Sequence, residues 1–520
     1  MYAHTVAKGT LSRNGREFVP YVTSERPNFG LELSCAVMAD RYEEHRRRLA
    51  EVVGTEGIAI VPAGREVARN HDVDYDFRQD TAFWYLTGFG EPDSVAVITP
   101  GHADGDYTLF VRPKDPAQEI WTGIRAGVEG AKEDHGADVA YELADLDDVL
   151  QRYMIGRDVV WYTPGNSHFD DRVTGILEKS RALRERYGYT VPSTVKDVSI
   201  VLGEMMLIKG EEEAESLRRA CDLSATGHME AMRFAQPAMY EYQVQAALEY
   251  YWRVSGSRHN GYPSIVASGH HACVLHYTEN SSRIGDSDLI LIDAAAEIDG
   301  YSSDITRTFP ASGEFTGPQR AVYEVVLAAE REGIERAVPG ATLGDIDDAA
   351  IRILTDGMVD LGLLPRDTDD SIAMAHYREF FMHGTSHWLG LDVHDRGSYR
   401  IEGKHRPLEP GMSFTVEPGI YIGLDKTEIE LVLAEVDVEE RAERRLRLGA
   451  KKAAAIEAEE LASADRIKHE IPKEFRGIGV RIEDDILITD RGHENLTSRV
   501  PTEFDDVEAL CAEESTLPAG

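Results

Sequence analysis

Two aspartates lie on either side of a turn signal in the middle of the chain. The segment reads LILIDAAAEIDGYSSDITRTF, with apolar or β-branched runs flanking the dipeptide Asp299-Gly300. Asp-Gly favours a two-residue turn with positive φ, so the segment predicts a β-hairpin. With that turn at its centre, Asp304 lies opposite Ala295, and the side-chain period of two places Asp304 and Asp293 on one face. Such a pair is a candidate half of a metal site, although solvated turn aspartates give the same spacing.

Further acidic and histidine-containing motifs follow downstream. They read HGTSHWLGLDVHD from residue 383, TVEPG around residue 417 and RIEDD around residue 483. Carboxylate oxygens with one imidazole nitrogen suit Mn²⁺, Co²⁺ or a similarly adaptable divalent ion, and soft thiolate ligands are absent from the set. Four ionised carboxylates are balanced by two divalent cations rather than one. The sequence therefore predicts a dinuclear metal site with the donors Asp293, Asp304, His387, Glu417 and Glu483.

Arg481 precedes Glu483 by two residues in a predicted strand, so the two side chains share a face. We expect Arg481 to orient the carboxylates as a hydrogen-bonding partner, with an ordinary surface arginine as the alternative. His383 lies four residues before His387, a spacing that fits one helical face or an adjacent strand. A histidine among apolar residues is often only a structural hydrogen-bonding group.

The order of these motifs resembles the creatinase and methionine aminopeptidase superfamily. The most similar branch is aminopeptidase P (Xaa-Pro aminopeptidase), of peptidase family M24B. Upstream, RNHDVDYDFRQDTAFWYLTGFGEPDS and RPKDPAQEIWTGIRAGVEGAKEDHGAD are similar to its amino-terminal domain, and downstream HYTEN, FFMHGTSHWLGLDVHD and GIGVRIEDDILIT are similar to its catalytic motifs. The resemblance implies a two-domain α/β (α+β) fold, a creatinase-like α/β N-terminal domain followed by a pita-bread catalytic domain.

The resemblance also implies an activity. It indicates a metal-dependent aminopeptidase that hydrolyses the bond between an N-terminal residue and a following proline, through attack of a metal-bridging hydroxide. Two divalent ions are implied, Mn²⁺ first, with Co²⁺ or Zn²⁺ as alternatives, and Asp304 and Glu483 correspond to the ligands shared by both ions. Glu417 corresponds to the carboxylate that also accepts the proton of the attacking water. His276 and His394 match substrate-facing histidines, and His383 matches a residue lining the site.

Xaa-Pro bonds need a dedicated enzyme, because the proline nitrogen carries no N–H and the ring fixes φ. The implied partners are peptides with proline at position two, and we expect their free α-amino group to lie near the metal carboxylates. A prolidase, which prefers Xaa-Pro dipeptides, remains an alternative. A creatinase-like enzyme without metals is disfavoured by the five ligand types. A binding or scaffold protein on the same fold is the alternative from another class.

The predicted domains are residues 1–200, an α/β domain with strands at GIAIVPAG, DSVAVITPG and DVVWYTPG, and residues 205–510, the catalytic domain. A long helix is predicted to begin near Gly210, where three glutamates suit the helix N-terminus. Residues 424–470 are longer than the family pattern and rich in Ala, Glu and Arg. The i,i+4 pairs there predict an exposed helical hairpin, either a solvated spacer or an element that narrows the site or contacts another subunit. Residues 511–520 form an acidic tail that we expect to be disordered.

Composition excludes several function classes. A net charge of −38 and a pI near 4.8 argue against nucleic-acid binding. Few lysines on an acidic surface also suit a high-salt cytoplasm, where screening reduces self-repulsion. Four scattered cysteines argue against a disulfide framework. The first residues lack the apolar core of a signal peptide and no run is long enough to span a bilayer, so we expect a cytoplasmic protein. The family resemblance allows a homo-oligomer.

Overall fold

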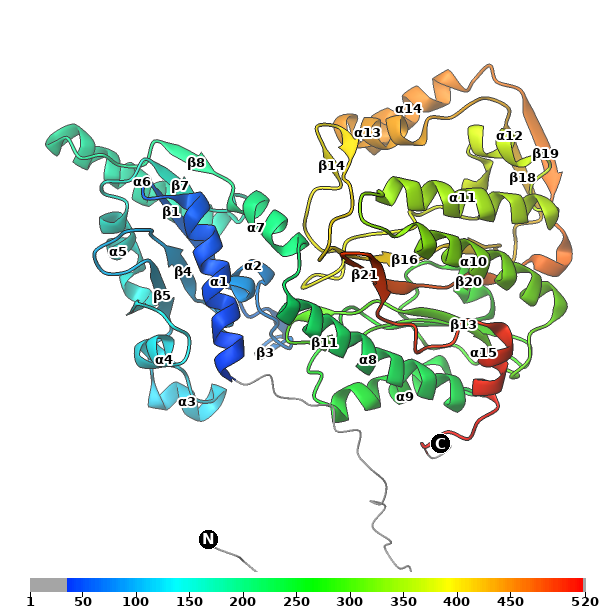
Figure 1. Ribbon diagram of the computed structural model, residues 1–520, viewed down its shortest axis with the longest axis horizontal. Coiled ribbons are helices and arrows are strands. Elements are labelled where there is room, and N and C mark those ends of the chain that lie inside the picture. The colour runs from blue at the N-terminus through cyan, green and yellow to red at the C-terminus, as the bar shows by residue number, and fades with distance from the viewer. Residues whose placement is uncertain (1–34, 518–520) are drawn as a thin grey trace, which may run out of the picture.

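A six-stranded sheet forms the N-terminal part of the chain, of which this computed structural model describes residues 35–517 (Figure 1). The strand order is β6-β5-β4-β1-β7-β8, antiparallel in the centre and parallel at both edges. The three runs predicted as strands correspond to β1, β4 and β7, which confirms the α/β prediction. The strand bounds are β1 Gly57–Pro62, β4 Val95–Ile98, β5 Tyr107–Val111, β6 Val139–Glu142, β7 Val159–Trp161 and β8 Thr194–Lys196, and a small outlying hairpin pairs β2 Ala68–Asn70 with β3 Val73–Asp74.

Helices cover both faces of this sheet. Along β1 the side chains alternate, so that Ile58 packs with α5 and α6 whereas Ala59 packs with α1, α2 and α7. Burial on both faces explains why β1 reads as a nearly continuous apolar run instead of an alternating one. The helices are α1 Cys35–Val53, α2 Thr81–Thr87, α3 Pro116–Thr122, α4 Gly127–Glu133, α5 Leu146–Tyr153, α6 Ser167–Tyr187 and α7 Val198–Leu207. The domain boundary predicted at residues 200–205 falls inside α7 and stays a prediction.

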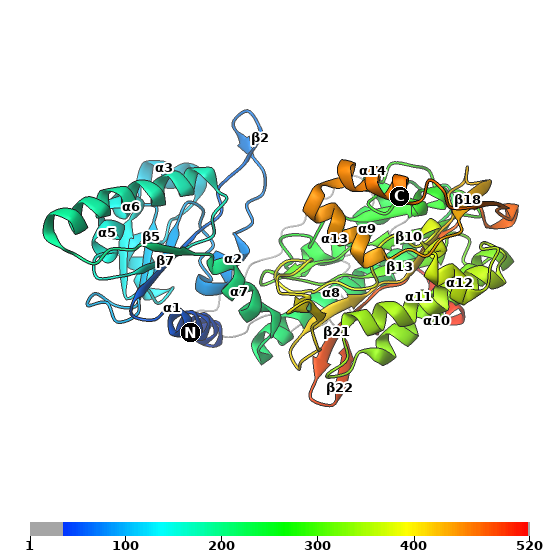
Figure 2. The same ribbon diagram turned by 90° about the horizontal axis from the view of Figure 1, so that it is seen from above.

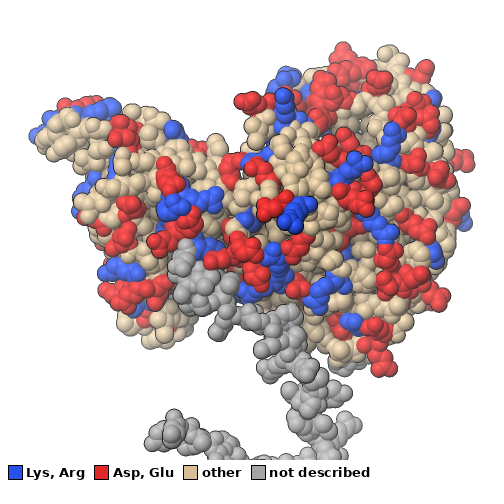
Figure 3. Space-filling model, in the orientation of Figure 1, with Lys and Arg blue, Asp and Glu red and all other residues tan. Residues whose placement is uncertain are grey.

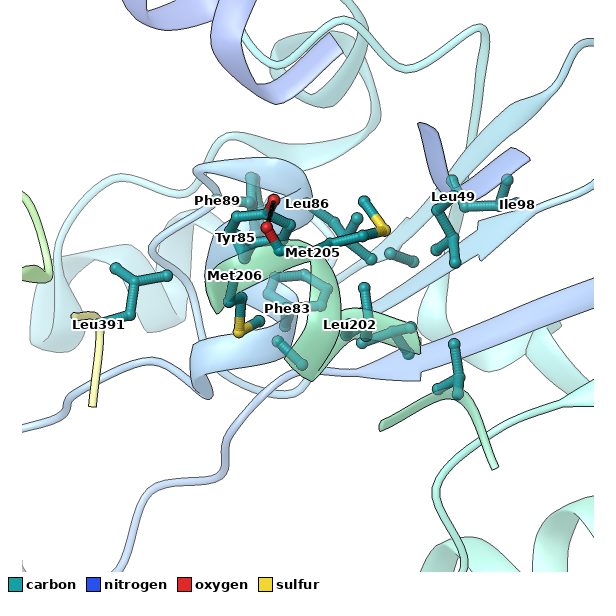
Figure 4. Packing of buried hydrophobic residues seen from close by; sticks show 14 of the residues in the cluster. Leu49, Phe83, Tyr85, Leu86, Phe89, Ile98, Leu202, Met205, Met206 and Leu391 are labelled. Carbon is teal, nitrogen blue, oxygen red and sulfur yellow. Dashed lines mark hydrogen bonds between the residues drawn. The ribbon is translucent and has the colours of Figure 1, made fainter. Parts of the chain in front are cut away.

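The N-terminal part docks on the C-terminal part through α2 and the segment before it. Trp84 Nε1 donates to the Asp299 carbonyl at 3.0 Å, and Arg78 Nε lies 2.6 Å from Glu297 Oε2. Leu391, from the C-terminal part, joins the apolar cluster around Phe83 (Figure 4). The docking contacts therefore reach the tip of the hairpin that carries the two predicted metal aspartates.

The C-terminal part contains small antiparallel sheets flanked by long helices (Figures 1 and 2). One sheet has the order β13-β10-β9 and another β16-β21-β22, and an isolated bridge between Thr306 and Glu483 links the two. The strands are β9 Ile265–Ser268, β10 Leu289–Asp293, β11 Glu297–Ile298, β12 Tyr301–Ser302, β13 Thr306–Pro310, β14 Arg400–Ile401, β15 Lys404–His405, β16 Ser413–Val416, β17 Gly419–Tyr421, β18 Glu428–Val432, β19 Arg466–Glu470, β20 Gly479–Arg481, β21 Asp484–Thr489 and β22 Gly492–Asn495.

The long helix predicted near Gly210 is α8, and Gly210 is its N-cap residue. The Glu213 side chain accepts from the Gly210 N–H at 2.8 Å, so an acidic first turn both caps the helix and suits its dipole. The remaining helices pack against the sheets or each other. Their bounds are α8 Glu211–Phe234, α9 Glu241–Val254, α10 Gly317–Arg336, α11 Leu343–Asp360, α12 Thr368–Ala373, α13 Val438–Leu448, α14 Ala450–Glu460 and α15 Phe504–Cys511, with a 3₁₀ turn, η3, at His376–Glu379.

The segment 424–470 contains the predicted helical pair, α13 and α14. Arg444 lies 2.7 Å from both Glu440 and Glu460. The first ion pair links successive turns of α13, and the second links α13 to α14. The sequence interpretation missed that a two-stranded ribbon, β18 with β19, carries this pair. Figure 1 shows the helices at the outer edge of the C-terminal part.

The acidic tail, residues 511–520, was expected to be disordered, but the structure describes it as ordered up to residue 517. Thr516 N and Ser515 Oγ donate to Glu230 of α8 at 2.7 and 2.6 Å, and Glu513 pairs with Arg233, so the expected disorder is wrong for this stretch. These contacts involve backbone and short polar groups, which leave no periodic signal in the sequence. The last three residues and the first 34, including the expected absence of a signal peptide, lie outside the described residues.

Among the side chains that the structure describes, Cys221, Cys273 and Cys511 are free thiols. Over residues 35–517, every helix is too short or too polar to cross a bilayer.

Candidate metal centre

The hairpin with the two aspartates forms in the predicted register. Asp299 and Gly300 have φ values of 54° and 86°, and strand pairing on both sides of the turn places Ala295 opposite Asp304. Asp293 ends β10 and Asp304 lies just before β13. The Tyr262 hydroxyl lies 2.6 Å from Asp293 Oδ1 and 2.5 Å from Asp304 Oδ1, which shows that both carboxylates point to the same side.

His387 and Glu417 reach this hairpin from a second sheet. Backbone bonds align the segment around His387 with β16, since Thr415 N donates to the His387 carbonyl and Glu417 N to the Thr385 carbonyl. His387 Nε2 lies 3.4 Å from Asp304 Oδ2 and 3.5 Å from Glu417 Oε1. Residues 383–387 are neither helix nor strand, so the helical-face and strand alternatives for His383 are both wrong.

Glu483 lies between β20 and β21 and completes the group of predicted ligands. Its backbone N–H donates to the Thr306 carbonyl at 3.1 Å, and its side chain accepts from the Thr306 hydroxyl at 2.6 Å. Donor atoms of Asp304, His387 and Glu483 all lie within 4.8 Å of one another, a spacing that can hold a metal ion. Two carboxylates and an imidazole are hard and borderline ligands, which suit a divalent first-row cation.

One cavity of about 620 Å³ collects the predicted residues. Segments far apart in the sequence thus converge on a single volume, as predicted. The nine predicted side chains that line it are His276, Asp293, Asp304, His383, His387, His394, Glu417, Arg481 and Glu483.

The electrostatics show an excess of buried negative charge. Burial raises the pKa of Glu417 to about 7, with Asp304 and Asp293 adding to the rise and His387 and Arg481 opposing it. Burial also raises the pKa of Asp293 and of Glu483. Burial lowers the pKa of His387, but Asp304 and Glu417 outweigh it and raise that pKa to about 9. A cluster that binds protons this strongly also fits cations of higher charge.

Arg481 is a buried cation beside this cluster. Its guanidinium contacts Asp293, and it donates to the Tyr421 hydroxyl and the Thr306 hydroxyl, both at 3.0 Å. Thr306 in turn donates to Glu483. The fork of Arg481 therefore orients two carboxylates, one directly and one through Thr306.

The three other histidines surround the carboxylates. His383 Nε2 lies 2.8 Å from the Tyr421 hydroxyl and its Nδ1 lies 3.6 Å from Glu417 Oε2; burial lowers the pKa of His383 to about 4, so it is neutral near pH 7. The His394 ring lies 4.2 Å from the His387 ring, and burial followed by the charge of His387 lowers the pKa of His394. His276 lines the cavity.

Tyr262 is a site residue that the sequence interpretation missed, as are Thr306 and Tyr421. It lies in a loop before β9, in the run NGYPS, where no period or motif distinguishes it from a turn tyrosine. Burial and the neighbouring aspartates raise its pKa, so it stays a neutral hydrogen-bond donor.

Comparison with known proteins gives matches along nearly the whole chain. Residues 42–161 match the aminopeptidase P N-terminal domain and residues 215–490 match metallopeptidase family M24. The Xaa-Pro aminopeptidase of Escherichia coli (strain K12) is 38% identical over 476 residues, 91% of this chain and 98% of that protein. The structure of the Pseudomonas aeruginosa aminopeptidase PepP has a TM-score of 0.81 at 41% identity, over 91% of this chain and 98% of that one. Human Xaa-Pro aminopeptidase 3 is 30% identical over 89% of this chain and 82% of its own length.

The fold and the site define a class: a two-domain metallopeptidase, with an α/β N-terminal domain and a pita-bread catalytic domain that holds a carboxylate-lined cavity. Matches to both domains at these identities make the assignment specific. The chain belongs to metallopeptidase family M24, in its aminopeptidase P branch.

Proposed function

We propose that the chain is a Xaa-Pro aminopeptidase, which hydrolyses the bond between an N-terminal residue and a following proline. The convergence of two aspartates, two glutamates and one histidine in one cavity carries this proposal. The similarity to proteins named Xaa-Pro aminopeptidase over 91% of the chain supports the choice of substrate.

The proposed ligands are the five predicted residues: Asp293, Asp304, His387, Glu417 and Glu483 would hold two divalent ions. Donor atoms of Asp304, His387 and Glu483 lie within 4.8 Å of one another, and Asp293 and Glu417 lie beside this triad. The family resemblance implies that Asp304 and Glu483 would contact both ions. Mn²⁺ is the proposed metal, with Co²⁺ and Zn²⁺ as alternatives, on the basis of the hard oxygen set. When bound, such ions generate a nucleophile from water near neutral pH and polarise the scissile carbonyl.

Protons in this reaction pass through Glu417. The family resemblance implies that Glu417 is the carboxylate that would take a proton from the nucleophile and give it to the departing proline nitrogen. His383, 3.6 Å from Glu417, is neutral; its Nδ1 donates to the Gly384 carbonyl and its Nε2 accepts from the Tyr421 hydroxyl, so it lines the site without adding charge. His276 and His394 line the same cavity, where they face the substrate. The carboxylate-rich wall suits the free α-amino group of the peptide and restricts cleavage to the first bond.

A peptide panel tests the proposal. The Mn²⁺-loaded protein is assayed with an Xaa-Pro dipeptide, an Xaa-Pro-Yaa tripeptide and an Xaa-Ala-Yaa tripeptide, with Glu417→Gln as the inactive control. We expect clear preference for the Xaa-Pro tripeptide. Preference for the dipeptide would assign a prolidase instead, and inactivity on every peptide at full metal occupancy would assign a binding protein. Cytoplasmic location and homo-oligomerisation remain predictions beside this proposal.

A further inference from the structure

A second, positively charged groove lies outside the metal cavity. We call it the insertion groove; it runs between η3 and α13 and has a volume of about 290 Å³. This is just below the roughly 300–1,000 Å³ of pockets that hold drug-sized ligands, so the groove is sized for a small ion or a terminal group and not for a larger molecule. Its charged and titratable lining consists of His376, Arg378, Glu379, Glu430, Arg441 and Arg445.

The glutamates of the insertion groove already have cations of their own. Lys426 Nζ lies 2.8 Å from Glu379, and Arg466 lies 3.5 Å from Glu430. Neither Lys426 nor Arg466 lines the groove. Both glutamates of the lining are thus paired with cations that lie outside the groove, and three arginines remain against these two carboxylates.

The arginines are less completely paired. Arg445 has one carboxylate partner, Glu457, at 3.1 Å. Among residues 35–517, Arg378 forms no ion pair, and the Arg441 side chain forms neither an ion pair nor a hydrogen bond. Arg441 and Arg445 are four residues apart on α13, so they project from one face of that helix, and Arg378 faces them from η3. Three guanidinium groups thus line one small groove on a chain whose net charge is −38.

One buried atom of the groove lacks a partner but would not bind the anion. His376 is 3% exposed and lines the groove; its Nε2 donates to the Val432 carbonyl at 2.8 Å. Its Nδ1 is buried and has no hydrogen-bond partner in the described structure. With the ring proton on Nε2, Nδ1 is an acceptor, so an oxyanion in the groove would be held by the arginines and not by His376.

The insertion groove also contacts the segment that leads to the metal cavity. Arg378 Nη2 donates to the Met382 carbonyl at 3.1 Å, and the next residue is His383. Two of its three arginines, Arg441 and Arg445, come from the segment 424–470, which carries none of the five proposed metal ligands. The groove is therefore built partly by an element that the proposed peptidase site does not use.

We propose that the insertion groove binds a small oxyanion, a carboxylate or a tetrahedral phosphate-like group, through Arg378, Arg441 and Arg445. Guanidinium groups recognise such oxygens through charge-assisted, often paired hydrogen bonds. The oxyanion is either a free anion or the C-terminal carboxylate of a peptide, and both present the same chemistry to the groove.

Sulfate binding to the metal-loaded protein tests the site. Calorimetric titration and thermal shift with sodium sulfate, against sodium chloride at the same ionic strength, separate binding from general screening of the acidic chain. We expect saturable sulfate binding by the unchanged protein, and a loss of affinity of roughly tenfold or more in Arg441→Gln and in Arg378→Gln. Arg447→Gln on the same helix is the matched control, because Arg447 does not line the groove and is 68% exposed; it keeps the affinity.

Two results would overturn the site. The first is a sulfate response equal to that of chloride. The second is an unchanged sulfate affinity in the double variant R378Q/R441Q, because the anion would then bind elsewhere, for example on the metal ions. Each variant is first compared with the unchanged protein for melting temperature without sulfate, so that a folding defect is not mistaken for lost binding. These readouts do not depend on peptidase activity.

The source of the oxyanion is tested separately and rests on the proposed function. The KM of an Xaa-Pro tripeptide is measured as free acid and as C-terminal amide in the unchanged protein and in R441Q. A KM that rises in R441Q only for the free acid assigns the groove to the peptide carboxylate. Equal KM values, together with lost sulfate binding, assign it to a free anion.

Discussion

The Lys209 ammonium lies 2.9 Å from Asp395 Oδ2, and both side chains are only 1% exposed. Lys209 immediately precedes the N-cap of α8, and Asp395 follows His394 on the loop that lines the metal cavity. The ion pair therefore fastens the start of the C-terminal part to an active-site loop. A buried charge that loses its partner is strongly destabilising, whereas removal of both charges is often close to neutral.

Lys209→Met is expected to lower the free energy of unfolding by about 3–5 kcal/mol, because it leaves Asp395 charged in a buried position. The double variant K209M/D395N, which removes both charges, is expected to recover most of that loss. Urea denaturation followed by circular dichroism measures both. Equal stability of the single and double variants would show that the pair has no energetic coupling.

Arg481→Lys is expected to reduce kcat/KM on an Xaa-Pro tripeptide roughly ten- to hundredfold, in line with residues that orient metal ligands. Lysine keeps the charge but cannot contact Asp293, Tyr421 and Thr306 at once, as the guanidinium does. Mn²⁺ titration of activity should show weaker metal binding in parallel.

The control for that experiment is Arg476→Lys. Arg476 donates to the Ile471 carbonyl and does not line the metal cavity, so this change should leave kcat/KM and the Mn²⁺ titration unaltered. An R481K enzyme with the same metal affinity as the unchanged protein would remove the positioning role from Arg481.

The metal aspartates were predictable because the information is local. Asp299-Gly300 sets the turn, the turn sets the register, and the register sets which face Asp293 and Asp304 share. Tyr262 was not predictable in the same way. Its contact with both aspartates depends on where the loop before β9 packs, and that packing involves segments 31 and 42 residues away.

The segment 424–470 shows the same contrast between features set by local sequence and features set by long-range packing. Charge spacing predicted α13 and α14, because Glu440 and Arg444 interact within one helix. The β18–β19 ribbon was missed, since its stabilising pairs, such as Lys468 with Glu428 at 2.7 Å, form between segments 40 residues apart and become legible only in the folded register. The insertion groove depends on still longer-range packing of α13 against η3.

Metal removal is expected to make stability depend on pH between about 6.5 and 9. The pKa of His387 is about 9 in the folded cluster and about 6.5 in an unfolded chain, so its contribution is fully present below pH 6.5 and is lost as the pH rises through 9. The loss is on the order of 3 kcal/mol. Thermal melts of protein treated with EDTA should show a falling melting temperature across this range.

Two controls accompany that measurement. His387→Gln, also treated with EDTA, should lose the part of the slope near pH 9, while Glu417, whose pKa is about 7 in the cluster, still titrates at the lower end of the range. The Mn²⁺-loaded protein should also be flatter, since metal binding competes with protonation of His387. An EDTA-treated protein whose melting temperature rises from pH 6.5 to 9 would contradict the assignment of a protonated His387 to this cluster.

Salt is expected to stabilise the protein. Acidic side chains are scattered over the face shown in Figure 3, with basic ones among them, and they outnumber the basic ones by 93 to 55 over the whole chain. Screening weakens the repulsion among like charges at the surface, while buried pairs such as Lys209 with Asp395 are screened little. Raising KCl from roughly 0.1 M, where the Debye length is about 10 Å, to above 1 M, where it is about 3 Å, should therefore raise the melting temperature by roughly 2 °C or more.

Glycerol at matched viscosity controls for general cosolvent effects. A melting temperature that is unchanged or lower in molar KCl would mean that exposed ion pairs such as Arg444 with Glu440 outweigh the net repulsion, and the surface would then carry no adaptation to a high-salt cytoplasm.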